Sequence, residues 1–178
     1  WIMRLKRKYK ITVIEDCCEA LGAQWRGQQV GSFGDLATFS FYPSHQINGL
    51  GTGGAVVTNN KTYAILMRSM RNWGKFAKKP YFTGDHVTEY IEDVDGVMYD
   101  EQYTYKTIGF NFLMPDVVAA YLRVQLKRLP GFIEKREENW EYLEWELREY
   151  FQTMDILPWA RPAYFGYTII HLNRDELA

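Results

Sequence analysis

Three side chains near the amino end carry groups that could do chemistry: the carboxylate of Asp16, the hydroxyl of Ser40 and the imidazole of His45. A carboxylate just after a strand can hold a cationic ring nitrogen, and a hydroxyl can donate to a phosphate oxygen. An imidazole titrates near neutral pH, which suits a general base. Each residue also has a simpler interpretation. Asp16 would be a helix N-cap, which its local sequence favours, Ser40 a donor to the backbone, and His45 polar surface.

The glycine-rich segment 49–54 matches the dinucleotide pattern G-x-G-x-x-G letter by letter. That pattern binds a dinucleotide only where it follows a strand and opens a helix. Here it leads into Ala-Val-Val-Thr at 55–58, which predicts a strand. We therefore interpret the segment as a turn in which the backbone passes close to a neighbour.

The remaining histidines, cysteines and acidic residues indicate no separate site. His86 and His171 have no partner at metal-ligand spacing, so both are interpreted as structural. The adjacent Cys17 and Cys18 are too few for a zinc site, and they predict small buried side chains in a reducing compartment. The acidic residues between 89 and 101 are more often a solvated face than a metal site. No metal is expected.

The elements that must position these side chains alternate between short β-branched runs and helical patterns, which predicts an α/β layer. Expected are strands at 11–15, 37–42, 55–58 and 164–172, a helical turn at 17–23, helices at 61–72, 115–129 and 132–151, and a break at Pro130-Gly131. The basic residues from Arg4 to Lys10 predict the solvent face of a first helix. Residues 75–105 show no clean period and predict a long irregular insertion.

Composition excludes several classes of protein. The 178 residues are 47% hydrophobic, which is too apolar for a disordered tail, and the net charge of −1 gives no electrostatic case for nucleic acid. No apolar run is long enough to cross a membrane, and no signal peptide is visible, so we expect a cytoplasmic protein. Because the chain begins at Trp1 rather than Met, we expect a fragment of a longer protein, inactive by itself.

Taken in order, several segments resemble the DegT/DnrJ/EryC1/StrS family of pyridoxal-phosphate enzymes, which act on nucleotide-linked keto sugars. These segments are Glu15–Ala23, Gly31–Asp35, Phe39–His45, Gly53–Thr58, Gly109–Asn111, Ala119-Ala120, Gln125-Leu126 and Lys135-Arg136. The resemblance covers nearly the whole chain. It implies an α/β fold of the PLP-dependent transferase type I (aspartate aminotransferase-like) class, with a mixed sheet, and a homodimer with shared active sites.

One position separates two activities within that family. Most members of the family that this chain resembles are aminotransferases. At the position of His45 they carry a lysine that binds the cofactor covalently. A histidine there resembles the small branch that removes the 3-hydroxyl of the sugar. Three further segments resemble that branch, as does the long insertion: Arg71–Gly74, Tyr103–Tyr105 and Phe165–Tyr167.

The resemblance also implies roles. Pyridoxamine 5'-phosphate would be held without a covalent bond, His45 would act as the base, and Asp16 would pair with the pyridine nitrogen. Ser40 would hold the phosphate, and Asn111 would reach the phosphate of the neighbouring subunit's cofactor. Glu19, where aminotransferases have Gln, completes the implied cofactor-binding residues. Glutamate would restore the pyridoxamine form of pyridoxal 5'-phosphate.

Some positions differ from the family pattern. Thr52 stands where an acidic residue is usual, Leu113 where a basic one is frequent, and the loop from His45 to Gly53 is one residue longer. One subgroup of the branch carries an iron–sulfur cluster on cysteines of the insertion. Residues 75–105 contain no Cys, so no iron–sulfur cluster is expected.

The expected organisation is a large cofactor-binding domain over 1–129, with its insertion at 75–105, followed by an interdomain helix and the start of a small domain over 130–178. The expected function is 3-dehydration of a GDP- or CDP-linked 4-keto-6-deoxyhexose in deoxysugar or O-antigen biosynthesis. The alternatives are a sugar-nucleotide aminotransferase and a catalytically inactive binding homologue.

Overall fold

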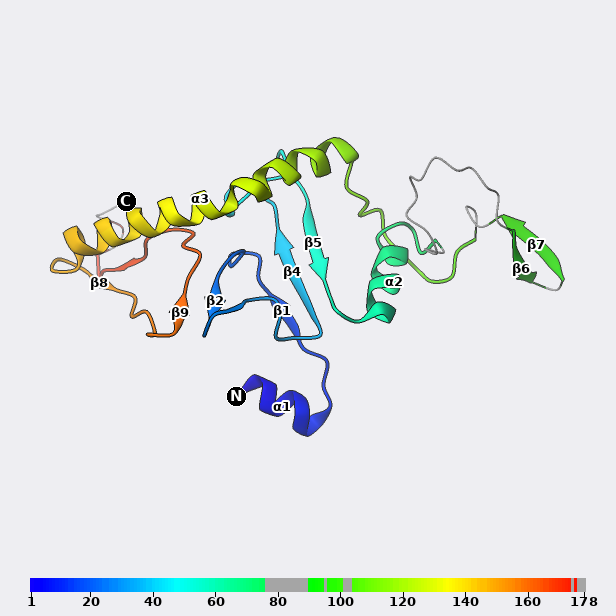
Figure 1. Ribbon diagram of the computed structural model, residues 1–178, viewed down its shortest axis with the longest axis horizontal. Coiled ribbons are helices and arrows are strands. Elements are labelled where there is room, and N and C mark those ends of the chain that lie inside the picture. Colours follow the sequence, from blue (N-terminus) through cyan, green and yellow to red (C-terminus); the bar gives the residue numbers. More distant parts are fainter. Residues whose placement is uncertain (76–89, 95, 101–103, 174, 176–178) are drawn as a thin grey trace. The chain divides into compact units, whose positions relative to one another are not determined.

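The computed structural model of the chain describes residues 1–75, 90–94, 96–100, 104–173 and 175 (Figure 1). The chain divides into two compact units. Unit 1 combines residues 1–57 with residues 116–178, and unit 2 is formed by residues 58–115. Each unit is described by itself below. The expected domain boundary at residue 129 remains a prediction.

The centre of unit 1 is a three-stranded mixed sheet with the order β1-β4-β5. Its strands are β1 (Ile14–Asp16), β4 (Leu36–Ser40) and β5 (Gly54–Val57). Strand β4 pairs with β1 in parallel and with β5 antiparallel, so it is the middle strand (Figure 1). Leu36, Ala37 and the neighbouring Cys17 are buried. The β-branched and aromatic runs therefore predicted the ends of these strands to within three residues.

Glu15, in the middle of β1, fixes the segment that leads into β4. Its carboxylate accepts backbone N–H groups from Gly31, Phe33 and Gly34 at 2.9, 2.7 and 2.5 Å. These are charge-assisted bonds to groups that would otherwise lack partners in an irregular loop. One side chain thus organises the segment that enters the middle strand.

The helical turn expected at 17–23 is not a helix, and that prediction was wrong. Ala20 and Ala23 each donate to the carbonyl three residues earlier, which makes two successive turns. Gly22 has a φ of +93°, a value outside the helical region. The chain then enters β2 (Gln24–Trp25), which pairs with β3 (Gln28–Gln29) and with β9 (Ala160–Arg161).

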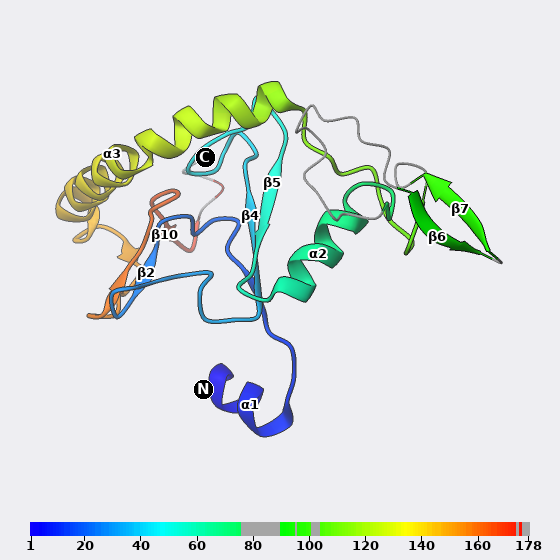
Figure 2. The ribbon, with the colours of Figure 1, turned by 45° about the vertical axis from the view of Figure 1, so that its right-hand side comes forward.

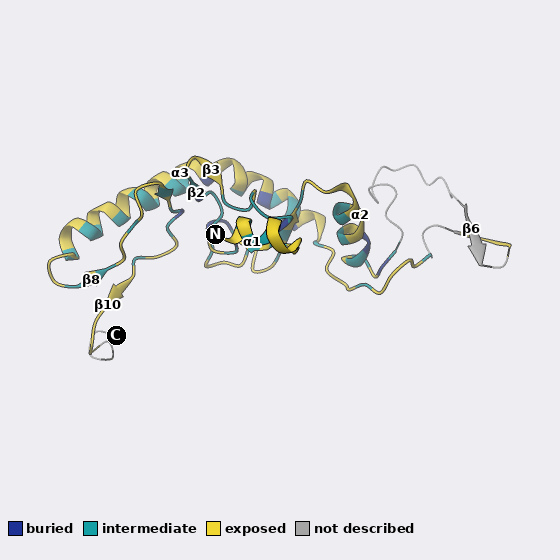
Figure 3. Ribbon diagram, turned by 90° about the horizontal axis from the view of Figure 1, so that it is seen from below, coloured by how far each residue is buried: buried dark blue, intermediate teal, exposed yellow. Residues whose placement is uncertain are grey.

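Helix α3 (Asp116–Leu147) runs without interruption through Pro130, so the break expected at Pro130-Gly131 was wrong (Figure 1). A proline inside a helix removes the bond to the carbonyl four residues earlier, here that of Leu126. Pro130 and Leu126 are both exposed, so water can satisfy this carbonyl. Val118, Leu122 and Leu129 are buried along the other side of the helix, and Figure 3 shows this division between buried and exposed faces. Figures 1 and 2 show α3 passing over the end of β4.

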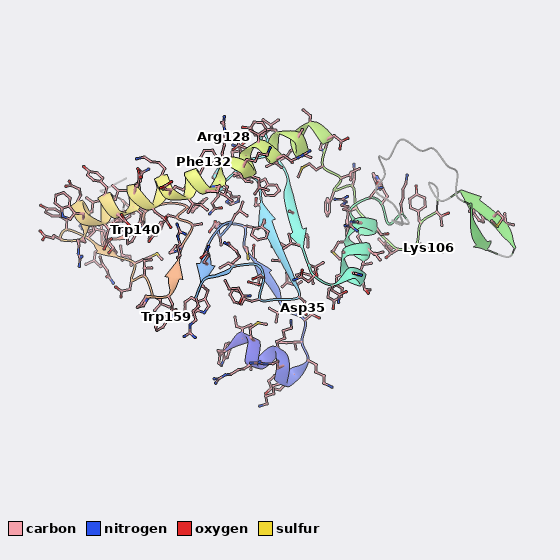
Figure 4. The ribbon with its side chains drawn as sticks, in the orientation of Figure 1. Asp35, Lys106, Arg128, Phe132, Trp140 and Trp159 are labelled. Atoms are coloured by element: carbon pink, nitrogen blue, oxygen red, sulfur yellow. The ribbon has the colours of Figure 1, made fainter. Side chains whose placement is uncertain are left out.

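The strand expected at 164–172 is reduced to β10 (Ile169–Ile170), paired with β8 (Gln152–Thr153). The preceding residues are used differently. The ring of Tyr164 stacks on Trp140 of α3 at 4.6 Å between centroids, and the Tyr167 hydroxyl donates to Glu144 at 2.9 Å. Aromatic side chains that pack on a helix do not alternate along a ladder. Figure 4 shows Trp140 on this helix.

Helix α1 (Ile2–Tyr9) has no buried residue and carries its basic side chains into solvent, as its sequence predicted. Lys6 is the exception, because its Nζ lies 2.7 Å from Oδ1 of Asp35. The other oxygen of Asp35 accepts the backbone N–H of Val13. Asp35, labelled in Figure 4, therefore connects α1 to the residues before β1 and β4.

Unit 2 begins with α2 (Lys61–Met70), which is capped by Asn60, whose side chain accepts the backbone N–H groups of Thr62 and Tyr63. The irregular insertion expected over 75–105 contains a hairpin of β6 (Tyr90–Val94) and β7 (Val97–Asp100). Both strands are rich in β-branched and aromatic residues, which favour extended backbone. Gly96, with a φ of +81°, lies in the turn between them. His86 and much of the expected acidic cluster lie outside the described residues. In the described part of the chain, no helix is long and apolar enough to span a membrane.

Candidate functional site

Asp16 lies at the carboxyl end of β1, opposite Thr38 of β4. Its Oδ1 accepts the backbone N–H of Cys18 at 3.2 Å and the hydroxyl of Thr38 at 3.3 Å. Hydrogen bonding from Cys18 and, to a smaller extent, from Thr38 holds the pKa of Asp16 below its usual value. Because no helix follows Asp16, the bond to Cys18 makes an Asx turn, and the N-cap interpretation is wrong. The carboxylate is anionic at neutral pH and exposed.

Ser40 lies on the same face of the sheet as Asp16. Residues two apart on a strand point to the same face, so Ser40 follows Thr38 on that face, and Thr38 pairs with Asp16. Strands β1 and β4 are parallel, which brings the carboxyl ends of both strands to one edge. The Ser40 oxygen accepts the backbone N–H of Tyr42 at 3.2 Å, which leaves its own proton to donate to a ligand. Ligands of open α/β sheets bind at such an edge.

His45 follows in the turn after β4. Its backbone N–H donates to the carbonyl of Tyr42 at 3.0 Å, which closes the turn that begins beside Pro43. The imidazole lies against the ring of Phe165, with centroids 5.5 Å apart, and meets the ring of Tyr42 at 6.3 Å. Its Nδ1 is buried and has no hydrogen-bond partner among the described residues.

The other two predicted site residues, Glu19 and Asn111, lie in different units of the chain. Glu19 is exposed, and its backbone carbonyl accepts a bond from the side chain of Gln46 at 2.6 Å. Asn111 belongs to unit 2, where it forms an isolated bridge with Asn72. The structure thus brings Asp16 and Ser40 to one face and edge, with His45 in the turn beyond that edge. The roles of all five residues as ligand-binding or catalytic groups remain predictions.

Gln46 is the residue that sequence reasoning missed. It is 2% exposed, its amide donates to two backbone carbonyls, and its own carbonyl accepts a bond from Arg136. A glutamine in a loop predicts a solvated side chain, since Gln is mostly exposed in proteins. Only its place directly after His45 singles it out in the sequence.

The cysteines beside the site are not reactive nucleophiles. Burial raises the pKa of Cys17 to about 11, and the neighbouring Glu15 and Asp16 carboxylates add to the shift. Hydrogen bonding to Asp16 raises the pKa of Cys18 as well. Both thiols are therefore protonated at neutral pH, and thiolate chemistry at this edge is not expected. Across the described ranges, no group of three His, Cys, Asp or Glu side chains is placed to hold a metal ion.

Comparison with known proteins identifies one family. The sequence model of the DegT/DnrJ/EryC1/StrS aminotransferase family matches residues 1–178. The chain is 35% identical to the lipopolysaccharide biosynthesis protein RfbH of Salmonella typhimurium, over 99% of the chain and 43% of that protein. It is 31% identical to a dTDP-4-dehydro-2,6-dideoxy-D-glucose 3-dehydratase of Saccharopolyspora spinosa, over 94% of the chain and 37% of that enzyme. It is also 33% identical to a transaminase of Campylobacter jejuni that is named for UDP-4-amino-4,6-dideoxy-N-acetyl-β-L-altrosamine.

Solved structures give the same result for the fold. A GDP-4-keto-6-deoxy-D-mannose-3-dehydratase from E. coli, with bound hydrated PLP, superimposes with a TM-score of 0.78 at 26% identity, over 99% of this chain and 45% of that one. An aminotransferase of the same family from Brucella abortus superimposes with a TM-score of 0.81 at 24% identity, which supports the fold alone. The chain spans 43% and 37% of the length of the first two relatives.

Proposed function

Because this chain belongs to the DegT/DnrJ/EryC1/StrS aminotransferase family, which includes sugar-nucleotide aminotransferases and 3-dehydratases, we propose that it forms part of a 3-dehydratase. The substrate is a nucleotide-linked 4-keto-6-deoxyhexose that carries GDP or CDP. One observation carries this proposal: the residue in the turn after β4, where aminotransferases of the family have lysine, is His45. The identity to a named 3-dehydratase supports it.

The residues at the sheet edge fit pyridoxal 5'-phosphate and its pyridoxamine form. A protonated pyridine nitrogen needs an anion, and the lowered pKa of Asp16 keeps that carboxylate charged. A phosphate needs donors, and the Ser40 hydroxyl retains a proton to donate. Glu19 completes the proposed set at this edge, and Asn111 is proposed to reach the phosphate of the neighbouring subunit's cofactor. When bound, the cofactor supplies an electron sink that makes loss of the 3-hydroxyl possible.

His45 moves protons in this proposal. With Nδ1 buried, Nε2 would act as general base on the proton of the cofactor's methylene carbon and, as general acid, would deliver that proton to the departing 3-hydroxyl, which leaves as water. Histidine cannot make the covalent link to the cofactor aldehyde that a lysine makes. The cofactor is therefore held by Asp16, Ser40 and their neighbours alone. This non-covalent retention is what distinguishes the proposed dehydratase from an aminotransferase.

Two other functions are kept as alternatives. An aminotransferase is favoured by the 33% identity to a transaminase, which is as close as the identity to the dehydratase. It would need a lysine from elsewhere. A binding homologue without turnover would keep the same ligand contacts. We further propose a cytoplasmic homodimer, with glutamate as amino donor, and with residues 1–129 in the large domain and 130–178 opening the small one.

The deciding experiment incubates the complete gene product that contains this chain with pyridoxamine 5'-phosphate, glutamate and GDP-4-keto-6-deoxymannose, and in parallel with the CDP-linked glucose-type keto sugar. Release of ammonia with a 3-deoxy sugar supports the dehydratase. Formation of an amino sugar would contradict it and support the aminotransferase. Sugar-nucleotide binding measured by calorimetry, without any product, would support the binding homologue.

A further inference from the structure

Within the described part of the chain, no hydrogen bond orients the imidazole of His45. Its Nδ1 has no partner among the described residues, and its two ring contacts, with Phe165 and Tyr42, are aromatic. Aromatic contacts tolerate offset and tilted geometries, so they limit the ring's position without fixing it. The position of Nε2 therefore depends on where the backbone at residues 45 and 46 is held.

Gln46 ties this turn to three other segments, twice through its side-chain amide and once through its backbone carbonyl. Its Nε2 donates to the carbonyl of Glu19 at 2.6 Å and to that of Ala163 at 3.1 Å, residues that are 27 and 117 positions away in the sequence. Its own carbonyl accepts a bond from Nη1 of Arg136 at 3.2 Å. The three partners come from the turns after β1, from the segment after β9 and from the middle of α3. Two of these bonds hold the side chain of Gln46 and one holds its peptide carbonyl, so residue 46 is tied to three separate segments of unit 1.

The segment after β9 contacts both residues of the pair. Ala163, which is 5% exposed, accepts the bond from Gln46, and Phe165, two residues later, contacts the His45 ring. This segment is itself held against α3 by the stack of Tyr164 on Trp140. The ring that contacts the imidazole and the carbonyl that binds Gln46 thus belong to one short segment, residues 163–165.

Burial of Gln46 also indicates a positional role. The Gln46 Oε1 atom is buried without a partner among the described residues. An apolar side chain of similar volume would avoid that unpaired acceptor. A buried amide with an unpaired oxygen adds little to the stability of the fold. When it nevertheless makes specific hydrogen bonds, it is typical of a residue that selects one arrangement of a loop.

From these contacts we propose that Gln46 and Arg136 are positioning residues, which hold the backbone of His45 so that its Nε2 meets the reacting carbon of the bound sugar and cofactor. This inference rests on the proposed role of His45. It adds that proton transfer depends on two residues that touch neither substrate nor cofactor. Gln46 acts through its amide donors and Arg136 through a single bond to a backbone carbonyl.

The test compares four variants of the complete gene product with wild type, using the sugar nucleotide that wild type converts. Gln46→Met keeps the volume, and Gln46→Glu keeps the shape; both remove the two donors. Arg136→Met removes the N–H that donates to the Gln46 backbone carbonyl, and Arg136→Lys retains an N–H donor at that position. We expect Gln46→Met, Gln46→Glu and Arg136→Met to lower kcat by about 10- to 100-fold, since a displacement near 1 Å suffices for such a loss. KM should stay within about threefold of wild type, because uniform binding is untouched.

Two controls separate positioning from folding. Lys135→Met changes the neighbouring residue of α3, which is paired with Glu138 at the surface, and kcat should be unchanged. Arg136→Lys should recover most of the activity that Arg136→Met loses. If Gln46→Met does not fold, as judged by its thermal midpoint, the Arg136 pair decides alone.

A crystal structure of Arg136→Met gives a readout that needs no turnover. We expect the His45 and Phe165 ring centroids to separate beyond the 5.5 Å of the present structure. Unchanged kcat in the three donor-removing variants of an active enzyme, with an unmoved His45 ring, would overturn the inference and leave the proposed function intact. A wild-type protein that converts no sugar nucleotide would contradict the proposed function instead, and the ring position would then decide the inference by itself.

Discussion

The hydroxyl of Thr38 donates to the carboxylate of Asp16 across the parallel pair β1 and β4, with 3.3 Å between Oγ1 and Oδ1. The bond joins side chains on directly paired residues, so the register of the sheet sets it. Together with the bonds from Cys18 it keeps the pKa of Asp16 low and the carboxylate charged. The chemistry proposed for Asp16 thus depends on the strand that ends at Ser40.

Asp16→Asn should weaken binding of pyridoxamine 5'-phosphate by about 10- to 100-fold, the loss expected when a charged partner is removed from a hydrogen bond. Isothermal titration of the complete gene product measures this.

Thr38→Val removes a donor that lowers the pKa of Asp16. On acidification, the Asp16 carboxylate of this variant should therefore become protonated, and cofactor binding should be lost, at a higher pH than in wild type. Asp155→Asn, an exposed change away from the sheet, should leave binding unchanged. Equal affinity in Asp16→Asn and wild type would contradict the role of Asp16.

His45→Asn should lower turnover by about 100- to 10,000-fold, the usual contribution of a general base, while cofactor binding persists. The measurement is ammonia release at saturating sugar nucleotide. His171→Asn is the matched control, because His171 packs on Phe151 outside the candidate site, and it should retain full activity. Turnover that survives in His45→Asn would show that another group is the base.

His45→Lys should allow pyridoxal 5'-phosphate to attach covalently to the protein. Borohydride reduction followed by peptide mass spectrometry locates the attachment at residue 45. The physical reason is proximity, since a lysine in this turn would lie where the family's aminotransferases hold theirs. Attachment only at other lysines would place residue 45 away from the cofactor.

Gly74→Ala should destabilise unit 2 by about 2 kcal/mol or more, because strain and overpacking each cost about 1–3 kcal/mol. Gly74 has a φ of +81°, and an added Cβ would collide with the carbonyl of Thr107. Gly96→Ala is the matched control, since Gly96 has the same φ but an added Cβ meets no described atom within 4 Å. The difference in thermal midpoint between the two variants isolates the collision, and equal midpoints would contradict it.

Glu137→Gln should reduce stability at neutral pH but not in acid. Glu137 accepts two bonds from Arg161, at 2.7 and 2.9 Å, and hydrogen bonding from Arg161 holds the Glu137 pKa below its usual value. A lowered carboxyl pKa contributes stability above the unfolded-state pKa, which is lost as pH falls through the folded value. The thermal midpoints of wild type and variant should therefore converge below the carboxyl range. Glu138→Gln, which breaks an exposed pair with Lys135, should change the midpoint little at any pH.

The parts of the fold that follow from local pattern were predictable. Runs of β-branched and aromatic residues predicted β1, β4 and β5, and the helical pattern at 61–72 predicted α2. The uninterrupted course of α3 through Pro130 was not predictable, because the sequence could not tell that Pro130 and Leu126 would both face water. Nor was the shortening of the last strand, since Tyr164 and Tyr167 find partners on α3.

The site divides in the same way. Asp16, Ser40 and His45 could be proposed because each follows or ends a predicted strand. Gln46 could not, because its importance depends on two carbonyls that are 27 and 117 residues distant and on an arginine in α3. A contact made through backbone groups leaves no residue-type signature at its acceptors.

The separation between Gln46 and Ala163 has a consequence for how the protein matures. Unit 1 is assembled from two stretches of chain with all of unit 2 between them. During synthesis the turn that carries His45 leaves the ribosome long before the carbonyl that completes its anchor, and contacts of such high sequence separation form late in folding. A nascent chain interrupted before Ala163 would therefore lack one of the three bonds of Gln46 and the Phe165 ring that faces His45, so the turn reaches its final arrangement only after these residues have been made.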